Sequence, residues 1–448
     1  MSTGNPSDET IEILRTLRSG WIISLIAVVL IGLLNFLVRR TLAVNLSIVD
    51  YGYFYSIFSF LSLFIAVFDL GTGQAGVILI AHSKAKGDDT AAHGLFSALL
   101  LFRIVVGAIA AGAFAAVAAP LADTYFKVPE GTPTLVTMCA WMGIMIVLGT
   151  LLSVFEGVKN FTARNSVLLC YYGLAFVLIT VGTQELTTLT AAGAFVGGGV
   201  VAFIVFLGYA GWRYGFRPSF DLQTGLDNLR KLWRCSRWIA VTTCGLLIMF
   251  NMDTIMLTWL TSLENVAEYN VALPIMQIFL SVLLVIPQVF IPLATELVHG
   301  EDISSLRRYA LRLTLLIFAL MGAACIGLYF EGARLISLLF TDHHSTASTA
   351  LLLLGVSVPF YIAAQLHLGI LNVMNREKTA AMVVLFGVGV NLISNAALIP
   401  LMDINGAAAA TLLSYLVIFA ASWHQFRSSS GDEENHQAAT ATGRENAE

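Results

Sequence analysis

The run AAHGLFSALLLFRIVVGAIAAGAFAAVAA, residues 91–119, decides the fold class. It is long enough to cross a bilayer as a helix, which takes about 20 apolar residues. Arg103, near its middle, is its only Lys, Arg, Asp or Glu. A charge at the bilayer centre costs roughly 2.5–3.5 kcal/mol on insertion scales. A protein that keeps such a charge usually needs it in a polar cavity, so the run predicts a transporter and not an anchor.

The composition extends this prediction to the whole chain. Of 448 residues, 57% are hydrophobic and 12% are charged, whereas a soluble protein carries about 25% charged residues. The sequence therefore predicts an all-α, polytopic membrane protein with twelve transmembrane helices. Beside 91–119, the predicted spans are 20–43, 53–81, 134–156, 165–183, 187–211, 238–261, 266–298, 311–331, 348–374, 379–400 and 404–426.

The loops between the predicted spans differ in charge. If the N-terminus is cytoplasmic, the cytoplasmic loops and ends carry about eighteen Lys and Arg residues, and the opposite side about four. Retention of basic residues on the cytoplasmic side is the positive-inside rule. We therefore expect both ends to be cytoplasmic.

The twelve spans divide into two similar sets. Asp50-Tyr51-Gly52 matches Glu268-Tyr269-Asn270, and Val158-Lys159-Asn160 resembles Val373-Met374-Asn375. Six spans return the chain to the same side, so the halves are predicted to be parallel repeats. The expected domains are then as follows: a six-helix bundle over 1–211, a cytoplasmic amphipathic linker over 212–237, a second bundle over 238–427, and a disordered cytoplasmic tail over 428–448.

Helix breakers occur at equivalent places in the second and eighth spans. The candidate break positions are Gly71, Gly73, Gly76, Pro287 and Pro292. Broken helices in both halves of a transporter mark its binding site. The glycines also spell GxGxxG, but a dinucleotide site needs a strand before that string. Because membrane spans flank it here, we expect helix distortion or close packing.

Charged and polar residues inside the spans are the candidate site residues. Asp69 and Arg103 are expected at similar depth, where they form a charge pair that either fixes packing or presents Arg103 to an anionic substrate. Arg39 and Arg40, near the outer end of the first span, either reach the interface or place one guanidinium in the cavity. Asn35 lies one helical turn before Arg39 and shares its face.

Asp253 is a second acid deep in a predicted span. It is a candidate for coupling to Na⁺ or a proton, or it completes a polar network. Asn372, Asn391 and Asn395 are interpreted as residues that join helices. We expect no metal site and no cofactor apart from such an ion. No nucleophile–base cluster or phosphate-binding GxxxxGK[ST] is present, so neither catalysis nor ATP use is predicted.

The region from Asn35 to Gly76 resembles the start of bacterial polysaccharide and O-antigen flippases. These belong to the multidrug/oligosaccharidyl-lipid/polysaccharide (MOP) superfamily, which also contains the MATE transporters. The resemblance rests on Arg39-Arg40, Asp50-Tyr51-Gly52 and Asp69-Leu70-Gly71, and on Asn251-Met252-Asp253 with Glu268-Tyr269-Asn270 in the second half. The general layout extends to about residue 427.

This resemblance implies two six-helix bundles that alternate their opening to flip an undecaprenyl-diphosphate-linked oligosaccharide, for polysaccharide or lipopolysaccharide synthesis. Arg39 or Arg40 and Arg103 would then face the diphosphate. The partners implied are the anionic lipid-linked oligosaccharide, membrane lipids and a polysaccharide polymerase or glycosyltransferases, without nucleic acid. Two alternatives stay open: an ion-coupled drug or small-cation antiporter of the same superfamily, and a membrane-embedded enzyme.

Overall fold

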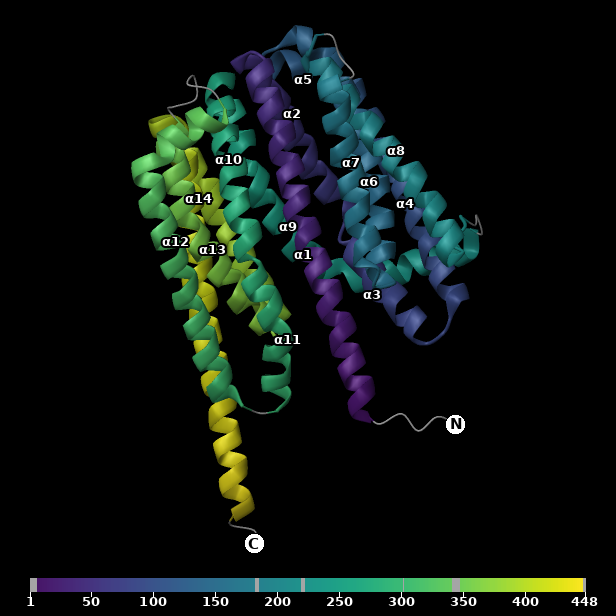
Figure 1. The fold of residues 1–448 in the computed structure, drawn as a ribbon, viewed down its shortest axis with the longest axis vertical. Helices are drawn as coiled ribbons and strands as arrows, with labels where there is room; N and C mark the ends of the chain where they lie inside the picture. The colour runs from purple at the N-terminus through teal and green to yellow at the C-terminus, as the bar shows by residue number, and fades with distance from the viewer. Residues whose placement is uncertain (1–5, 182–184, 219–221, 301, 341–346, 446–448) are drawn as a thin grey trace. The chain divides into compact units, whose positions relative to one another are not determined.

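The computed structural model consists almost wholly of helices and describes residues 6–181, 185–218, 222–300, 302–340 and 347–445 (Figure 1). Within these residues, ten helices are long and apolar enough to cross a membrane. The last, over 377–428, contains two of the predicted spans, which meet at the non-helical Asp403. The seventh span corresponds to the shorter apolar stretch Cys244–Leu260. The chain is thus a multi-pass membrane protein, and the number twelve stays a prediction.

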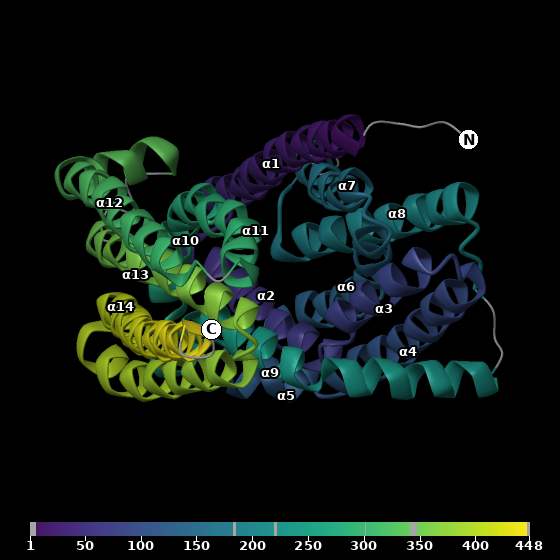
Figure 2. The same ribbon diagram turned by 90° about the horizontal axis from the view of Figure 1, so that it is seen from below.

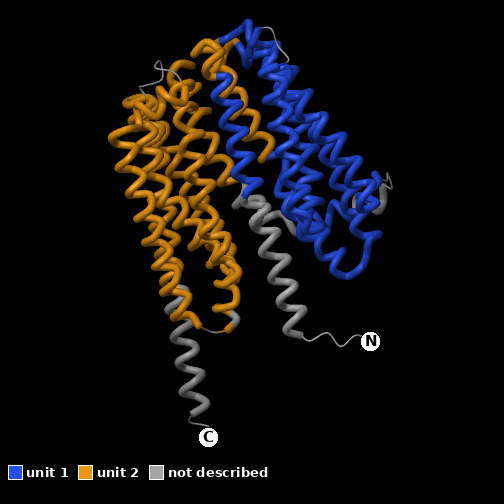
Figure 3. The backbone as a smooth tube through the Cα atoms, viewed as in Figure 1, with its two compact units in different colours: residues 1–42, 67–122, 128–237 blue, residues 43–66, 123–127, 238–448 orange. Residues whose placement is uncertain are grey.

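The helices group into two compact units, which are described separately (Figure 3). Unit 1 comprises residues 1–42, 67–122 and 128–237, and unit 2 comprises residues 43–66, 123–127 and 238–448. In chain order the α-helices are α1 (Pro6–Asn45), α2 (Ile48–Asp69), α3 (Thr72–Ala85), α4 (Asp89–Ala116), α5 (Ala118–Thr124), α6 (Thr132–Gly157), α7 (Phe161–Val181), α8 (Thr188–Tyr214), α9 (Leu222–Leu260), α10 (Leu263–Leu283), α11 (Val285–His299), α12 (Ile303–Leu339), α13 (Ala347–Val373) and α14 (Glu377–Glu445).

Each unit is built around one central helix. In unit 1, α6 packs against α3, α4, α7 and α8 (Figure 2). In unit 2, α13 packs against α10, α11, α12 and α14. The predicted repeat makes α6 and α13 equivalent, because they are the fourth predicted span of each half.

The C-terminal turns of α6 and α13 fix the register of the repeat. Lys159 and Asn375 both have left-handed backbones, with φ of 60° and 56°. The next residue in each case, Asn160 or Arg376, donates its backbone N–H to the carbonyl five residues earlier. Lys159 is therefore equivalent to Asn375. The predicted match of Val158-Lys159-Asn160 with Val373-Met374-Asn375 was wrong by one residue.

The first part of α2 belongs to unit 2, although the predicted boundary places all of residues 1–211 in the first bundle. Close contacts explain this grouping. A Cβ on Gly52 would lie 2.0 Å from the Leu263 carbonyl oxygen. The Tyr51 hydroxyl donates to the Asn270 carbonyl at 3.2 Å, and Thr258 donates to the Ser56 hydroxyl at 2.8 Å. At position 52, only glycine allows α2 to approach the backbone of Leu263 this closely.

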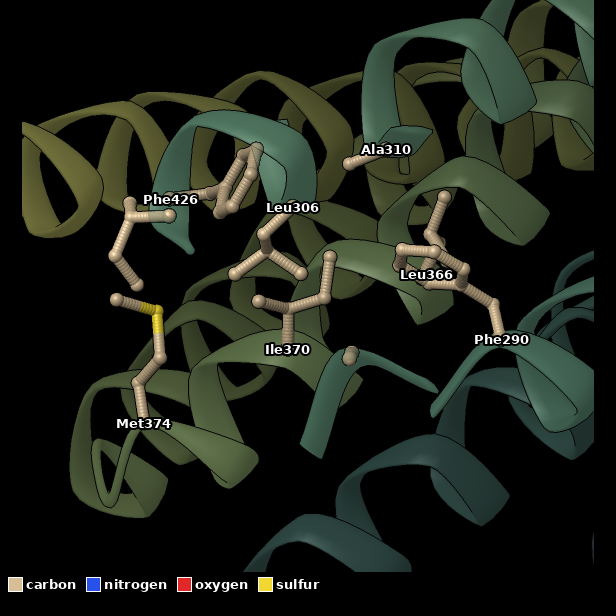
Figure 4. Packing of buried hydrophobic residues seen from close by; sticks show 9 residues of the cluster. Phe290, Leu306, Ala310, Leu366, Ile370, Met374 and Phe426 are labelled. Carbon is tan, nitrogen blue, oxygen red and sulfur yellow. The ribbon is translucent and has the colours of Figure 1, made fainter. Parts of the chain in front are cut away.

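A buried apolar cluster joins α11, α12, α13 and α14 in unit 2 (Figure 4). Its members include Phe290, Leu306, Leu366, Ile370 and Phe426. Because these side chains come from four helices, their burial holds one end of the unit together. The hydrophobic effect contributes roughly 1.5–3 kcal/mol for each large side chain that is fully buried.

Two predicted segments differ in extent from the helices found. The predicted linker 212–237 contains the end of α8 and the start of α9, and α9 runs on without a break to Leu260. Within it Leu232 is buried while Arg230 and Lys231 are exposed. The tail from residue 428 was predicted to be disordered, whereas α14 continues to Glu445.

Candidate functional site

The break between α2 and α3 lies at Leu70 and Gly71. Both residues have left-handed backbones, with φ of 51° and 68°. Asp69, at the end of α2, accepts the backbone N–H of Gly73 at 3.2 Å through its carboxylate. The Thr72 hydroxyl donates to the Asp69 carbonyl at 2.6 Å. The carboxylate therefore lies at the N-terminus of α3, where the helix dipole favours a negative charge.

The structure brings Asp69 and Arg103 together as an ion pair, through Arg103 Nη2 and Asp69 Oδ1. The two side chains differ in burial, because Arg103 is 2% exposed and Asp69 is 30% exposed. The Nε and Nη1 atoms of Arg103 are buried, and neither has a hydrogen-bond partner among the described residues. A buried donor without a partner costs about 1–3 kcal/mol, so the guanidinium has two donors that an additional acceptor could use.

Two glycines make room for this guanidinium. A Cβ on Gly149 of α6 would lie 2.5 Å from Arg103 Nη1, and a Cβ on Gly73 of α3 would lie 2.9 Å from Nη2. Gly76 faces a different neighbour, because its Cβ would lie 2.9 Å from Leu99 Cδ2. Of the glycines predicted at the break, Gly71 lies in it, whereas Gly73 and Gly76 lie inside α3 at close contacts.

The equivalent break in the second half separates α10 from α11 at Leu284. Pro287 lies in the first turn of α11, where its missing N–H removes the bond that would continue α10. Pro292 lies farther inside α11. Leu284 keeps a right-handed backbone, with φ of −61°, so this break is milder than the one at Leu70 and Gly71.

The other predicted cavity residues lie on α1 in unit 1. Arg39 is buried, with 6% of its surface exposed, and it is within electrostatic reach of Tyr172 on α7. Arg40 is exposed and Asn35 is half-buried. The adjacent arginines thus have different surroundings, as adjacent positions on a helix require.

Asp253 lies in unit 2 and is the centre of a polar network. Its Oδ2 accepts hydrogen bonds from the Tyr269 hydroxyl at 2.6 Å and from the Thr411 hydroxyl. Its Oδ1 accepts the side-chain amides of Asn395 at 2.7 Å and of Asn391 at 3.4 Å. All four partners are neutral, and Asp253 is 5% exposed.

The charge of Asp253 has no basic partner within the described ranges. A buried carboxylate without a counter-charge is costly, so such a group either binds a proton or acquires a cation. The Oδ1 atom of Asn395 is buried and has no hydrogen-bond partner in the part of the chain that the structure describes. Carboxylate, amide and hydroxyl oxygens are ligands that hard cations prefer, so the residues present fit either ion.

Sequence reasoning missed part of both clusters. Asn391 and Asn395 of α14 join helices as interpreted, because they donate to Asp253 of α9, but their place in the network around Asp253 was not predicted. Their spacing of one helical turn was the available signal, because it places both amides on one face. Gly149 and Thr411 gave no signal, since one glycine or threonine in an apolar run is ordinary. Asn372 donates no side-chain hydrogen bond to this network.

Comparison with known protein families gives two matches. The family model described as "Polysaccharide biosynthesis protein" matches residues 17–298, which is more than half of the chain. The model described as MatE matches residues 239–397. An uncharacterized membrane protein of Methanocaldococcus jannaschii is 26% identical over 223 residues, 49% of this chain and 44% of that protein. The chain thus spans less than half the length of this curated relative.

Solved structures share the fold over almost the whole chain. An inward-facing multidrug resistance MATE family transporter of the MOP superfamily matches with a TM-score of 0.70 at 14% identity, covering 92% of this chain and 99% of that one. The lipid II flippase MurJ in an inward closed conformation also matches with a TM-score of 0.70 at 14% identity, covering 92% of this chain and 90% of that one. The fold is therefore that of MOP-superfamily transporters.

Proposed function

The chain belongs to the polysaccharide biosynthesis protein family of the MOP superfamily, and from this premise we propose that it flips an undecaprenyl-diphosphate-linked oligosaccharide across the bacterial inner membrane. The family match over residues 17–298 carries this proposal. The substrate's diphosphate cannot cross hydrocarbon unaided, because desolvating its charges costs many kcal/mol. A transporter that alternates its access replaces those water contacts while the prenyl tail stays in lipid.

Arg103 is the proposed partner of the diphosphate. Its planar guanidinium suits phosphate oxygens, which it can bind through two donors at once. Asp69 occupies Nη2, while Nε and Nη1 have no hydrogen-bond partner. Because Arg103 is only 2% exposed, an anion reaches it only after a rearrangement. The break with left-handed backbone at Leu70 and Gly71 lies directly beside this ion pair.

The test is a flipping assay with a fluorescent lipid-diphosphate sugar in proteoliposomes. We expect Arg103→Ala to lower the flipping rate at least tenfold and Arg103→Lys to retain part of it, because lysine keeps the charge but loses the planar fork. Arg334→Gln is the matched control, since Arg334 is exposed and pairs with the exposed Glu331. Flipping that is unchanged in both Arg103 variants would exclude a substrate role for this residue.

Coupling to an ion gradient is proposed for Asp253. The network of Tyr269, Asn391, Asn395 and Thr411 holds its carboxylate in one place, and a bound Na⁺ or proton would supply the missing positive charge. Flipping into proteoliposomes would be driven by one of the two gradients and would lose that dependence in Asp253→Asn. A wild-type flipping rate that is the same with and without either gradient would reject coupling.

A second function, ion-coupled export of organic cations, is favoured by the MatE match over residues 239–397 and by the exposure of Asp69 beside the buried Arg103. Uptake of an organic cation into the same proteoliposomes separates the two functions. The flippase proposal also implies cooperation with a polysaccharide polymerase or glycosyltransferases. Loss of surface polysaccharide after deletion of the gene, restored by the wild-type protein, would support that role.

A further inference from the structure

A cavity of about 420 Å³ lies in unit 1, at the end where α3, α6 and α8 finish. Lys84 of α3, Lys159 just after α6 and Tyr214, the last residue of α8, line it. Its volume falls within the usual range for small-molecule sites, roughly 300–1,000 Å³. The loops at this end are the ones that the charge pattern predicts to be cytoplasmic.

The turn that follows α6 builds one wall of the cavity. Lys159 has a left-handed backbone with φ of 60°, and Asn160 donates its backbone N–H to Phe155 at 2.7 Å. Gly157 allows close packing of α3 against α6, because a Cβ there would lie 3.0 Å from Ile80. Lys84 and Lys159, which come from separate elements, thus line the same cavity.

The protein holds the Tyr214 side chain in place, while its hydroxyl hydrogen is still available to donate. Its hydroxyl oxygen accepts the side-chain amide of Asn160 at 2.7 Å, and the side-chain oxygen Oδ1 of Asn160 accepts the Ala163 N–H at 2.9 Å. Its ring packs at 6.4 Å from Phe155 and 6.2 Å from Phe216. The Tyr214 O–H has no protein acceptor within the described chain, so it can donate to a bound group.

The charges around the cavity leave it net positive. Lys84 pairs with Asp89 at 2.6 Å and lies over the Phe216 ring at 5.4 Å. Glu156, which lies three residues before Lys159, forms an ion pair with Arg164 at 3.0 Å. Lys159 is exposed and has no ion pair with the described residues. One uncompensated lysine and one free hydroxyl donor suit a phosphate.

We propose that this cavity binds the phosphate headgroup of an anionic phospholipid of the cytoplasmic leaflet. Basic pockets between transmembrane helices on the cytoplasmic side bind anionic lipid headgroups. Lys84 and Lys159 supply the charge, and the Tyr214 hydroxyl donates to a phosphate oxygen. The apolar walls formed by Ala81 and Val158 adjoin the acyl chains. This site is independent of the transported substrate and of Arg103.

The test is native mass spectrometry of the full-length protein with added phosphatidylglycerol or neutral phosphatidylcholine. An uncompensated lysine is worth roughly fivefold in affinity for an anionic lipid, and Lys84 already pairs with Asp89. Lys84→Gln with Lys159→Gln should therefore weaken phosphatidylglycerol binding by at least roughly fivefold. Tyr214→Phe should weaken it by roughly threefold. The matched control is Lys86→Gln with Arg217→Gln, which removes the same charge from exposed residues that do not line the cavity.

Three results would overturn the proposal. In the first, the control weakens binding as much as the cavity variant, which would mean a diffuse surface charge. In the second, phosphatidylcholine binds as well as phosphatidylglycerol. In the third, excess inorganic phosphate displaces the lipid, which would assign the cavity to a soluble phosphate. Thermal unfolding of every variant checks the fold, and the single Tyr214→Phe change keeps the test valid if the lysine double variant does not fold.

Discussion

At the scale of single residues, Arg103 shows how a buried charge is accommodated in a membrane helix. It is paired with Asp69, and the glycines at 73 and 149 leave room for the guanidinium. Removing one partner of a buried pair leaves a charge uncompensated, which costs about 3–5 kcal/mol. The partial exposure of Asp69 lowers this cost on its side of the pair.

This asymmetry gives a first prediction. Asp69→Asn should destabilise the protein by roughly 3–5 kcal/mol, because the amide keeps the shape but leaves the buried guanidinium of Arg103 without a counter-charge. Adding Arg103→Gln should restore part of the loss, since the double variant has no unpaired charge. Thermal unfolding in detergent of the wild type, the two single variants and the double variant forms a double-mutant cycle. Additive effects would mean that the ion pair contributes nothing to stability.

A second prediction concerns Gly149. Gly149→Ala places a Cβ 2.5 Å from Arg103 Nη1, and the guanidinium has little room to move because Gly73 and Asp69 adjoin its other side. Overpacking of this kind costs about 1–3 kcal/mol. Gly112→Ala is the control, because no atom lies within 4 Å of its added Cβ. Equal melting temperatures for the two variants would show that the guanidinium shifts freely.

At the scale of elements, the break between α2 and α3 depends on left-handed backbone at Leu70 and Gly71. This conformation costs roughly 1–2 kcal/mol for a residue with a Cβ. We therefore expect Gly71→Ala to destabilise the protein by about that amount, measured by thermal unfolding. Gly32→Ala in α1, where nothing lies within 4 Å, should be neutral or stabilising because alanine favours helix. A destabilised Gly32→Ala variant would contradict this explanation.

The sequence predicts the helices and their breaks, but not the contacts between segments far apart in the chain. Apolar runs locate helices because lipid requires long apolar segments, and the breaks follow from glycine and proline chemistry. The contact between Gly52 and Leu263 depends on packing between segments about 200 residues apart, which no local pattern encodes. For the same reason the repeat was misaligned by one residue until the left-handed turns at Lys159 and Asn375 fixed its register.

At the scale of the whole molecule, the two acids inside predicted spans have contrasting surroundings. Asp69 in unit 1 has a guanidinium partner, whereas Asp253 in unit 2 has only neutral donors. The sequence predicted that both acids matter, because charges inside apolar runs are conspicuous. It could not distinguish their surroundings, since Tyr269 reaches Asp253 from α10, and Asn395 and Thr411 reach it from the two parts of α14 on either side of Asp403.

The orientation of the chain follows from its charge pattern and gives the last prediction. Lys and Arg are retained on the cytoplasmic side, so Lys86 and Ser304 are expected inside and Glu130 and Arg334 outside. Each is exposed, so replacing it by cysteine in a cysteine-free background gives an accessible thiol. A membrane-impermeant maleimide added to intact spheroplasts should label Glu130→Cys and Arg334→Cys, and should label Lys86→Cys and Ser304→Cys only after the membrane is permeabilised. The opposite pattern would invert the topology and would place the basic cavity of unit 1 on the outer side, away from the cytoplasmic leaflet lipids proposed to bind it.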